Sequence, residues 1–148
     1  MWRAVVVIVI GLTLGGCGVD RLILAPQFNG VLEANGKAVE GAAVRVVVIA
    51  RADGSTVTAT TNADGHFSTE AITEFGVISI GDRVAPSYVV EVRFAGKRYA
   101  YYSGFNPIIK RQQSLQCNIP TQHETYQKHT IDDEFVGTLK MECRKDDY

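Results

Sequence analysis

Three cysteines carry the most distinctive covalent chemistry in this chain, and they fall into two groups. Cys17 stands alone near the start, whereas Cys117 and Cys143 lie near the end. A thiol can be acylated, can act as a nucleophile, or can pair with a second thiol in a disulfide. Cys117 and Cys143 do not have the Cys-X-X-Cys spacing of most catalytic dithiols, so a redox pair is disfavoured. What each thiol does therefore depends on the compartment to which the chain is sent.

The segment that precedes Cys17 has the pattern of a secretory signal. Arg3 supplies a fixed positive charge, and residues 4–14 (AVVVIVIGLTL) are apolar apart from one glycine and one threonine. This stretch is too short for a membrane-spanning helix, which needs about 20 apolar residues, but it fits the short apolar region of a signal peptide. Residues 14–17 (LGGC) resemble the lipobox of bacterial lipoprotein precursors. The resemblance implies that residues 1–16 are removed as a signal peptide and that Cys17 becomes the acylated first residue.

A lipid on Cys17 would anchor the protein to a membrane, because each buried acyl CH₂ contributes about 0.8 kcal/mol. Gly18 follows the cysteine where inner-membrane retention favours Asp, which by resemblance to bacterial sorting rules implies the periplasmic face of the outer membrane. The alternatives are a secreted protein in which Cys17 is incidental, or a chain that keeps a short apolar anchor. On the lipoprotein interpretation, residues 17–27 are a short tether and residues 28–148 are the folded domain.

Export also changes the expectation for the other two cysteines. Paired cysteines in an oxidising compartment usually form a disulfide. We therefore predict a Cys117–Cys143 disulfide that links a strand at residues 114–119 to the last strand, with Cα atoms about 4.4 to 6.8 Å apart.

Histidines suggest a metal site, but their spacing is wrong. His123 and His129 lie in a polar segment, residues 120–134 (PTQHETYQKHTIDDE), and a His-Glu-X-X-His zinc motif would need a histidine at 127, where the chain has Gln. A loose site built from His66, His123 and His129 is the alternative to solvated histidines. Residues 62–65 (NADG) resemble a calcium loop only faintly and favour a tight turn. We expect no metal or cofactor.

Catalytic and stacking sites are also disfavoured. The chain has no Gly-X-Ser-X-Gly nucleophile motif, so a hydrolase is the weakest of the functions considered and we do not expect an enzyme. Tyr99, Tyr101, Tyr102 and Phe105 could stack on sugar rings. Core packing is the favoured interpretation for Tyr99 and Tyr101, which leaves Tyr102 and Phe105 as candidates.

Length and charge bound the domain. Removing residues 1–16 from 148 leaves 132 residues, enough for one domain with a core. Removal also takes Arg3, so 14 basic side chains oppose 16 acidic ones, a balance of −2. No stretch is basic enough for nucleic-acid binding.

Short alternating apolar segments between turn signals predict an all-β fold, a two-sheet sandwich of seven to nine strands. Asn35-Gly36, Asp53-Gly54 and Asp64-Gly65 are favoured turn dipeptides. Besides residues 42–51 and the hairpin described next, strands are expected at residues 28–33, 56–61, 66–69, 77–80, 114–119 and 136–143.

Two of these strands carry a stronger signal. In residues 42–51 (AAVRVVVIAR) the even positions form one apolar face, which is typical of a central strand. A two-residue loop with Gly96 first predicts a type II′ hairpin that places Phe94 opposite Tyr99 and Val92 opposite Tyr101. Those four residues and Val90 would then share one face.

The first half of the chain resembles transthyretin-like, carboxypeptidase-regulatory-like sandwich domains. The resemblance covers residues 28–72 and rests on two motifs. The first comprises Gly36, Lys37, Val39, Gly41, Ala42 and Val44, and the second comprises Thr60, Thr61, Asp64, Gly65 and Phe67. Such domains are usually non-catalytic, so the resemblance implies an architecture more than an activity.

We therefore expect a membrane-anchored binding or structural module with a protein or cell-envelope partner. The expected contact residues lie on the polar segment 120–134, which we expect can be shortened across 121–130 at little cost in stability, and on a strip of the central sheet. They are His123, Tyr126, Lys128 and His129 on the segment, and Val47, Ile49 and Tyr102 on the strip. The alternatives are an immunity protein or inhibitor of a periplasmic hydrolase or toxin and, least favoured, a hydrolase.

Overall fold

The computed structural model describes residues 21–49, 55–75, 87–103, 110–122, 124–127 and 135–146. These residues form twelve β-strands and no α-helix, which confirms the all-β prediction. The count exceeds the expected seven to nine because several strands are only two to five residues long. In this part of the chain no helix has the length and apolar character needed to cross a membrane.

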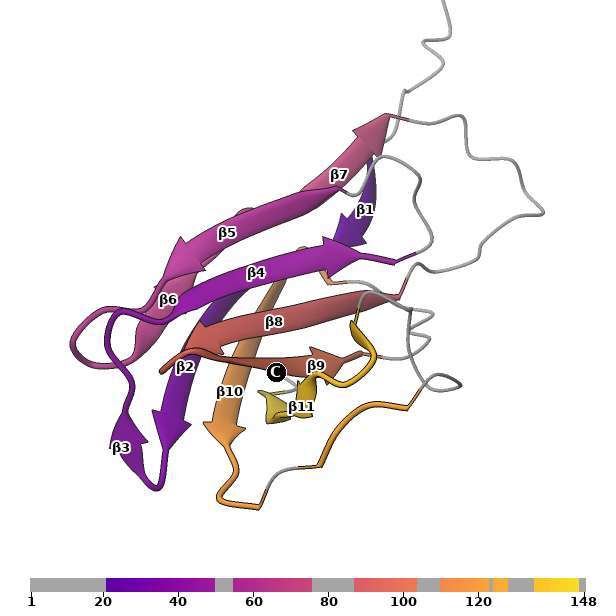
Figure 1. Cartoon of the computed structure of the whole chain (residues 1–148). Helices are drawn as coiled ribbons and strands as arrows, with labels where there is room; N and C mark the ends of the chain where they lie inside the picture. Colours follow the sequence, from indigo (N-terminus) through magenta and orange to yellow (C-terminus); the bar gives the residue numbers. More distant parts are fainter. Residues whose placement is uncertain are drawn as a thin grey trace, which may run out of the picture.

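Two five-stranded sheets and one strand pair make up the fold (Figure 1). The β2 sheet contains β12 (Glu142–Asp146), β10 (Gln112–Ile119), β2 (Gln27–Ala34) and β3 (Lys37–Ala38), with β6 (His66–Ser68) also paired to β2. The β4 sheet runs β11 (Leu139–Lys140), β9 (Lys97–Tyr102), β8 (Tyr88–Phe94), β4 (Ala43–Val48) and β5 (Thr56–Thr60). The third unit pairs β1 (Arg21–Ala25) with β7 (Ile72–Phe75).

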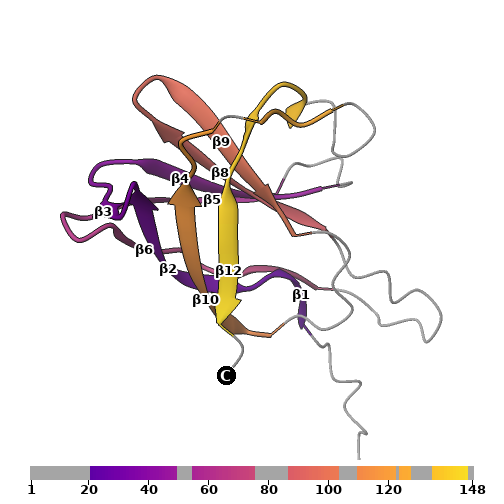
Figure 2. The same cartoon turned by 90° about the horizontal axis from the view of Figure 1, so that it is seen from below.

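The two large sheets pack face to face around the main core, and their strands run in clearly different directions (Figures 1 and 2). Strand alternation supplies the core, as predicted: Val44, Val46 and Val48 of β4 point inward and are buried. The β2 sheet contributes Phe28, and the centroid of its ring lies 5.3 Å from that of Tyr88 across the interface. β4 lies between β5 and β8, so its central position is confirmed.

The β8–β9 hairpin has a different register from the predicted one. Val92 pairs with Tyr99, and Phe94 pairs with Lys97, so the loop is Ala95-Gly96. Both loop residues have positive φ, 49° and 74°, which is the conformation of a type I′ turn and not of type II′. The error of two residues leaves the faces intact, because side chains alternate with a period of two.

Strands predicted at residues 28–33, 56–61, 66–69 and 114–119 are confirmed to within two residues at their ends. The strand expected at 136–143 is instead two short ones, β11 and β12, after Gly137 with φ of 78°. The strand expected at 77–80 and the turn at Asp53-Gly54 lie outside the described residues.

The folded part starts earlier than expected. Residues 21–25 of the expected tether form β1, and Leu24 and Ala25 are buried in the main core. The sequence analysis did not predict its partner β7 either, because both strands are only four or five residues long.

Cys117 and Cys143 form the predicted disulfide between β10 and β12. The two cysteines lie directly opposite each other in the antiparallel register. Their Cα atoms are 4.1 Å apart, just below the expected range. A separation this short is typical of opposed residues that do not share backbone hydrogen bonds.

Several motif residues of the first half lie in turns or in the core. Asn35 and Gly36 both have positive φ in the β2–β3 turn, and Val39 and Phe67 are buried. The 62–65 segment is the expected tight turn: the Asn62 side-chain oxygen accepts hydrogen bonds from the backbone N–H groups of Asp64 (3.0 Å) and His66 (2.9 Å). The strands that it joins, β5 and β6, belong to different sheets.

Candidate binding surfaces

The strip expected to bind a partner is covered by the chain itself. Val47 is only 6% exposed, and it belongs to a second buried cluster with Val89, Ala100, Tyr126 and Phe135. This cluster lies on the face of the β4 sheet that points away from the main core. Ile49 and Tyr102 pack against it half-buried, so the strip is a second core and not a free surface.

Tyr126 anchors the cover, which corrects its expected role as a contact residue. Its side chain is buried, and the backbone N–H of Tyr102 donates a hydrogen bond to its hydroxyl oxygen (3.2 Å). Burial raises the pKa of Tyr126 above its ordinary value, so the phenol stays neutral. The Tyr126 backbone N–H also donates a hydrogen bond to the Thr138 carbonyl (3.0 Å). This bond joins residues 124–127 to residues 135–138, and together these two segments cover the outer face of the β4 sheet around Val47.

The two residues before Tyr126 also contact β11. The Lys140 backbone N–H donates to the Glu124 carbonyl (2.6 Å), and the Lys140 ammonium lies 3.1 Å from the Glu124 carboxylate. Thr125 forms a β-bridge with Leu139. The expectation that residues 121–130 are dispensable is therefore wrong for 124–127. His123, Lys128 and His129 lie outside the described residues.

A buried carboxylate bound by three arginines lies on the same face. Glu91 of β8 is 1% exposed and receives hydrogen bonds from Arg45 (3.2 Å), Arg93 (3.1 Å) and Arg98 (3.1 and 2.6 Å). The Phe135 ring covers this arginine cluster, with its centroid 6.0 Å from the guanidinium carbons of Arg45 and Arg98.

The arginine cluster keeps Glu91 ionised. Burial alone would raise the pKa of Glu91, but hydrogen bonds from Arg98, Arg45 and Arg93 and the nearby Arg45 charge outweigh it, so the pKa lies below its ordinary value. Sequence reasoning missed this cluster because the predicted hairpin register placed Arg93 opposite Ala100. In the structure Arg93 lies opposite Arg98.

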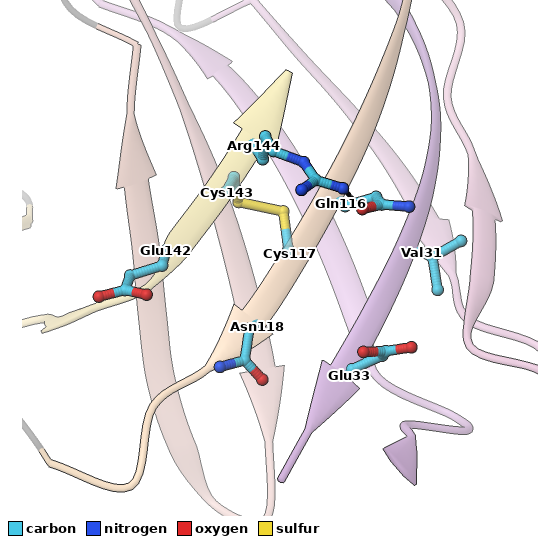
Figure 3. Close-up of a pocket in the computed structure, with 8 residues that line it drawn as sticks. All are labelled: Val31, Glu33, Gln116, Cys117, Asn118, Glu142, Cys143 and Arg144. Carbon is cyan, nitrogen blue, oxygen red and sulfur yellow. Dashed lines mark hydrogen bonds between the residues drawn. A yellow bond between two sulfur atoms is a disulfide. The ribbon is translucent and has the colours of Figure 1, made fainter. Parts of the chain in front are cut away.

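The outer face of the β2 sheet is polar and open (Figure 3). Neighbouring strands align its side chains in rows, one of which runs Glu142, Asn118, Glu33. In the next row Arg144 donates a hydrogen bond to Gln116, which lies beside Val31. A third row runs from Asp146 through Ser114 and Asn29 to Ser68.

Two shallow hollows adjoin on this face. One of about 400 Å³ lies over the row of Glu33, Asn118 and Glu142 beside the disulfide (Figure 3). The other, of about 590 Å³, extends towards Asn29 and His66, and the two share Val31 and Gln116 as lining. Their walls offer amide, hydroxyl and carboxylate groups, which can hydrogen-bond a polar partner.

Within the described ranges, no three potential ligands among His, Cys, Asp and Glu come together to hold a metal ion. His66 lies exposed in β6 beside the second hollow. Comparison with known proteins found no matching family model, no matching curated protein and no matching solved structure. The function must therefore be argued from the surfaces themselves.

Replacing Tyr126 with Ala should lower the free energy of unfolding by about 3 kcal/mol, because it opens the second core. Tyr126→Phe should cost about 1 kcal/mol through loss of the hydrogen bond from Tyr102. Urea unfolding measures both. The exposed neighbour Gln127→Ala is the control and should change stability by less than about 0.5 kcal/mol. Equal stability of Tyr126→Ala and the parent would show that the cover does not pack.

Replacing Glu91 with Gln should lower the free energy of unfolding by about 2 to 4 kcal/mol at pH 7, because three guanidinium groups lose the carboxylate that they share. The folded pKa of Glu91 lies below its ordinary value of 4.5. Its ionised form therefore stabilises the fold above that pH, and the contribution is lost as the pH falls through the folded pKa.

The difference in the free energy of unfolding between Glu91→Gln and the parent should therefore become smaller when urea unfolding is repeated below about pH 4. Glu33→Gln, an exposed glutamate on the other sheet, is the matched control. A gap that stays constant with pH would contradict the ionised role of Glu91.

Proposed function

We propose that the protein is a lipid-anchored envelope protein that binds a polar partner, without catalysis, through the outer face of the β2 sheet. One observation carries the choice of surface. The apolar part of the outer face of the β4 sheet, around Val47, Val89 and Ala100, is closed by Tyr126 and Phe135, whereas the outer face of the β2 sheet is polar and lined by two adjoining hollows.

The anchor is supported by the sequence before β1. Residues 14–17 resemble a lipobox, and β1 begins at Arg21, so the chain from Cys17 to the first strand spans at most about 14 Å. A lipid on Cys17 would hold the sandwich close to the bilayer. The end at which β1 starts, where β4 also ends, would lie nearest to the membrane (Figures 1 and 2).

The partner's chemistry follows from the side chains on the exposed rows. Asn29, Gln116 and Asn118 offer amides, and Glu33 and Glu142 offer carboxylates. Such a surface suits a partner rich in hydrogen-bond donors, a polar protein face or an envelope polymer. Glu124, Thr125 and Tyr126 of segment 120–134 contact the β4 sheet, so these residues give no support to an inhibitor that plugs a cleft. The resemblance to non-catalytic sandwich domains agrees with a binding role.

The anchor is tested by changing Cys17 to Ser in the native envelope. We expect the wild type to incorporate labelled fatty acid and to fractionate with membranes, and the variant to do neither. A wild type without label, together with a variant that stays with membranes, would contradict the lipid anchor.

The binding face is tested by affinity capture from the envelope followed by mass spectrometry. Asn118→Arg places bulk and charge in the centre of the Glu142–Asn118–Glu33 row. It should sharply reduce recovery of the partner without changing the melting temperature. Thr56→Arg, on an exposed position of β5, is the control and should leave recovery intact. Loss with Thr56→Arg but not with Asn118→Arg would place the contact on the other sheet.

A further inference from the structure

Arg93 and Arg98 lie directly opposite each other in the β8–β9 hairpin. Opposed residues on one face of an antiparallel pair have Cβ atoms about 4.5 to 5.5 Å apart, and like charges at that distance destabilise the pair. Both side chains reach out of the surface, with 61% and 40% of their area exposed. A negative charge placed beside this pair would remove the repulsion between the two arginines.

Glu91 supplies only part of that counter-charge. Its single negative charge is shared by Arg93, Arg98 and Arg45, all of which donate to its two oxygens. It is also 1% exposed, below the outer ends of the two opposed arginines. The Glu91 carboxylate therefore fixes the guanidinium groups in place but cannot balance both Arg93 and Arg98.

The two arginines keep hydrogen-bond donors to spare. Arg93 uses only Nε, which donates to Glu91 Oε1 (3.1 Å), and Arg98 uses Nε and Nη2. A guanidinium carries five N–H groups. In the described structure both terminal nitrogens of Arg93 and Nη1 of Arg98 make no hydrogen bond. Guanidinium groups held in a fixed orientation with unused N–H groups match the geometry of phosphate oxygens.

We propose that Arg93 and Arg98, oriented by Glu91, form a binding site for a phosphate group at the β8–β9 end of the β4 sheet. Phosphate suits two arginines better than a carboxylate ligand does, because a phosphate group offers three acceptor oxygens and about two negative charges. The site is distinct from the polar face of the β2 sheet.

The surroundings leave room for the phosphate. The row that contains the pair continues from Arg93 to Ala43 and Thr60, so a small exposed side chain and a hydroxyl group lie beside it. On the other side, a hollow of about 350 Å³ borders Arg98 and includes Lys97. Lys97, which pairs with Phe94, points to the opposite face of the sheet and is not part of the site.

The position favours a phosphate that is not part of the protein's own membrane. The β8–β9 turn and the start of β1 lie at opposite ends of the sandwich (Figures 1 and 2). An anchor at Cys17 would hold the arginine pair at the far end from the bilayer. A soluble or polymer-borne phosphate therefore fits better than a lipid headgroup.

Residues 132–134 (DDE) carry three acidic side chains close in sequence to Phe135. They precede Phe135, whose ring lies over Arg45 and Arg98, and they lie outside the described residues. Because these acids adjoin Phe135 in the sequence, the experiment must separate their charge from that of a ligand.

The test is a titration of the full-length protein, in zwitterionic detergent, with inorganic phosphate, followed by NMR of the arginine side-chain Nε–H groups. We expect saturable shifts at Arg93 and Arg98 with a dissociation constant below about 1 mM. Arg93→Gln should weaken binding at least about tenfold, and added salt should weaken it further. Arg144→Gln removes a more exposed positive charge from the other sheet and should leave phosphate binding unchanged.

Three results would overturn the proposal. The first is the absence of saturable shifts in the parent protein. The second is equal weakening by Arg93→Gln and Arg144→Gln, which would indicate only a general charge effect. The third is binding that occurs only after Asp132, Asp133 and Glu134 are changed to Asn, Asn and Gln, because those acids would then occupy the site. The melting temperature of Arg93→Gln is measured alongside, and Arg93→Lys should restore part of the affinity if charge placement matters.

The source of the phosphate is distinguished with vesicles. Full-length Cys17→Ser protein is mixed with phosphatidylcholine vesicles, with or without phosphatidylglycerol. Given phosphate binding, equal sedimentation with both vesicles supports a soluble or polymer-borne phosphate. An excess on phosphatidylglycerol that Arg93→Gln abolishes supports the same site acting on a lipid headgroup.

Discussion

Burial of β4 and β8 on both faces is the constraint from which the rest of this structure follows. Residues 88–92 of β8 are all buried, and in β4 both Val46 and Val47 are buried although they point to opposite sides. A strand that is apolar on both sides needs a cover on each. The β2 sheet covers one side of these strands, and Tyr126 and Phe135 cover the other.

Double burial also explains why Glu91 is held as it is. A carboxylate in the middle of a strand that is buried on both faces must be hydrogen-bonded and neutralised, because an isolated buried charge is very costly. Arg45 on β4 and Arg98 on β9 reach it from the two neighbouring strands, and Arg93 reaches it from two residues along β8 itself. The requirement of one buried acid thus gathers three guanidinium groups at one end of the β4 sheet, and two of them extend into solvent.

The sequence predicts the architecture better than the surfaces. Strict alternation identifies the core face of β4, and the expectation of export predicts the disulfide, because both rest on local pattern or on composition. The Arg93–Arg98 pair could not be predicted, because it depends on an Ala95-Gly96 turn in which a non-glycine residue has a positive φ. A slip of two residues preserves every buried face, so the apolar pattern cannot reveal it.

The packing of residues 124–127 on the β4 sheet also could not be predicted from the sequence pattern. Their polar composition is typical of a solvated loop, and only Tyr126 has the apolar bulk that packs on Val47 and Ala100. One aromatic residue among polar neighbours gives no periodicity to recognise. Tyr126 is buried because it packs on apolar side chains of the β4 sheet that are far from it in the sequence.

Around Val47, where Tyr126 and Phe135 cover it, the outer face of the β4 sheet is interior, whereas the outer face of the β2 sheet is open. Thiol labelling in the Cys17→Ser background tests it most directly, with single cysteines at Val47 and at Thr56, its exposed cross-strand neighbour. We expect Thr56→Cys to react with a maleimide as a free thiol does. Val47→Cys should react at least about a hundredfold more slowly, because Tyr126 and Phe135 must first move away from it. Equal rates in two folded variants would contradict this expectation.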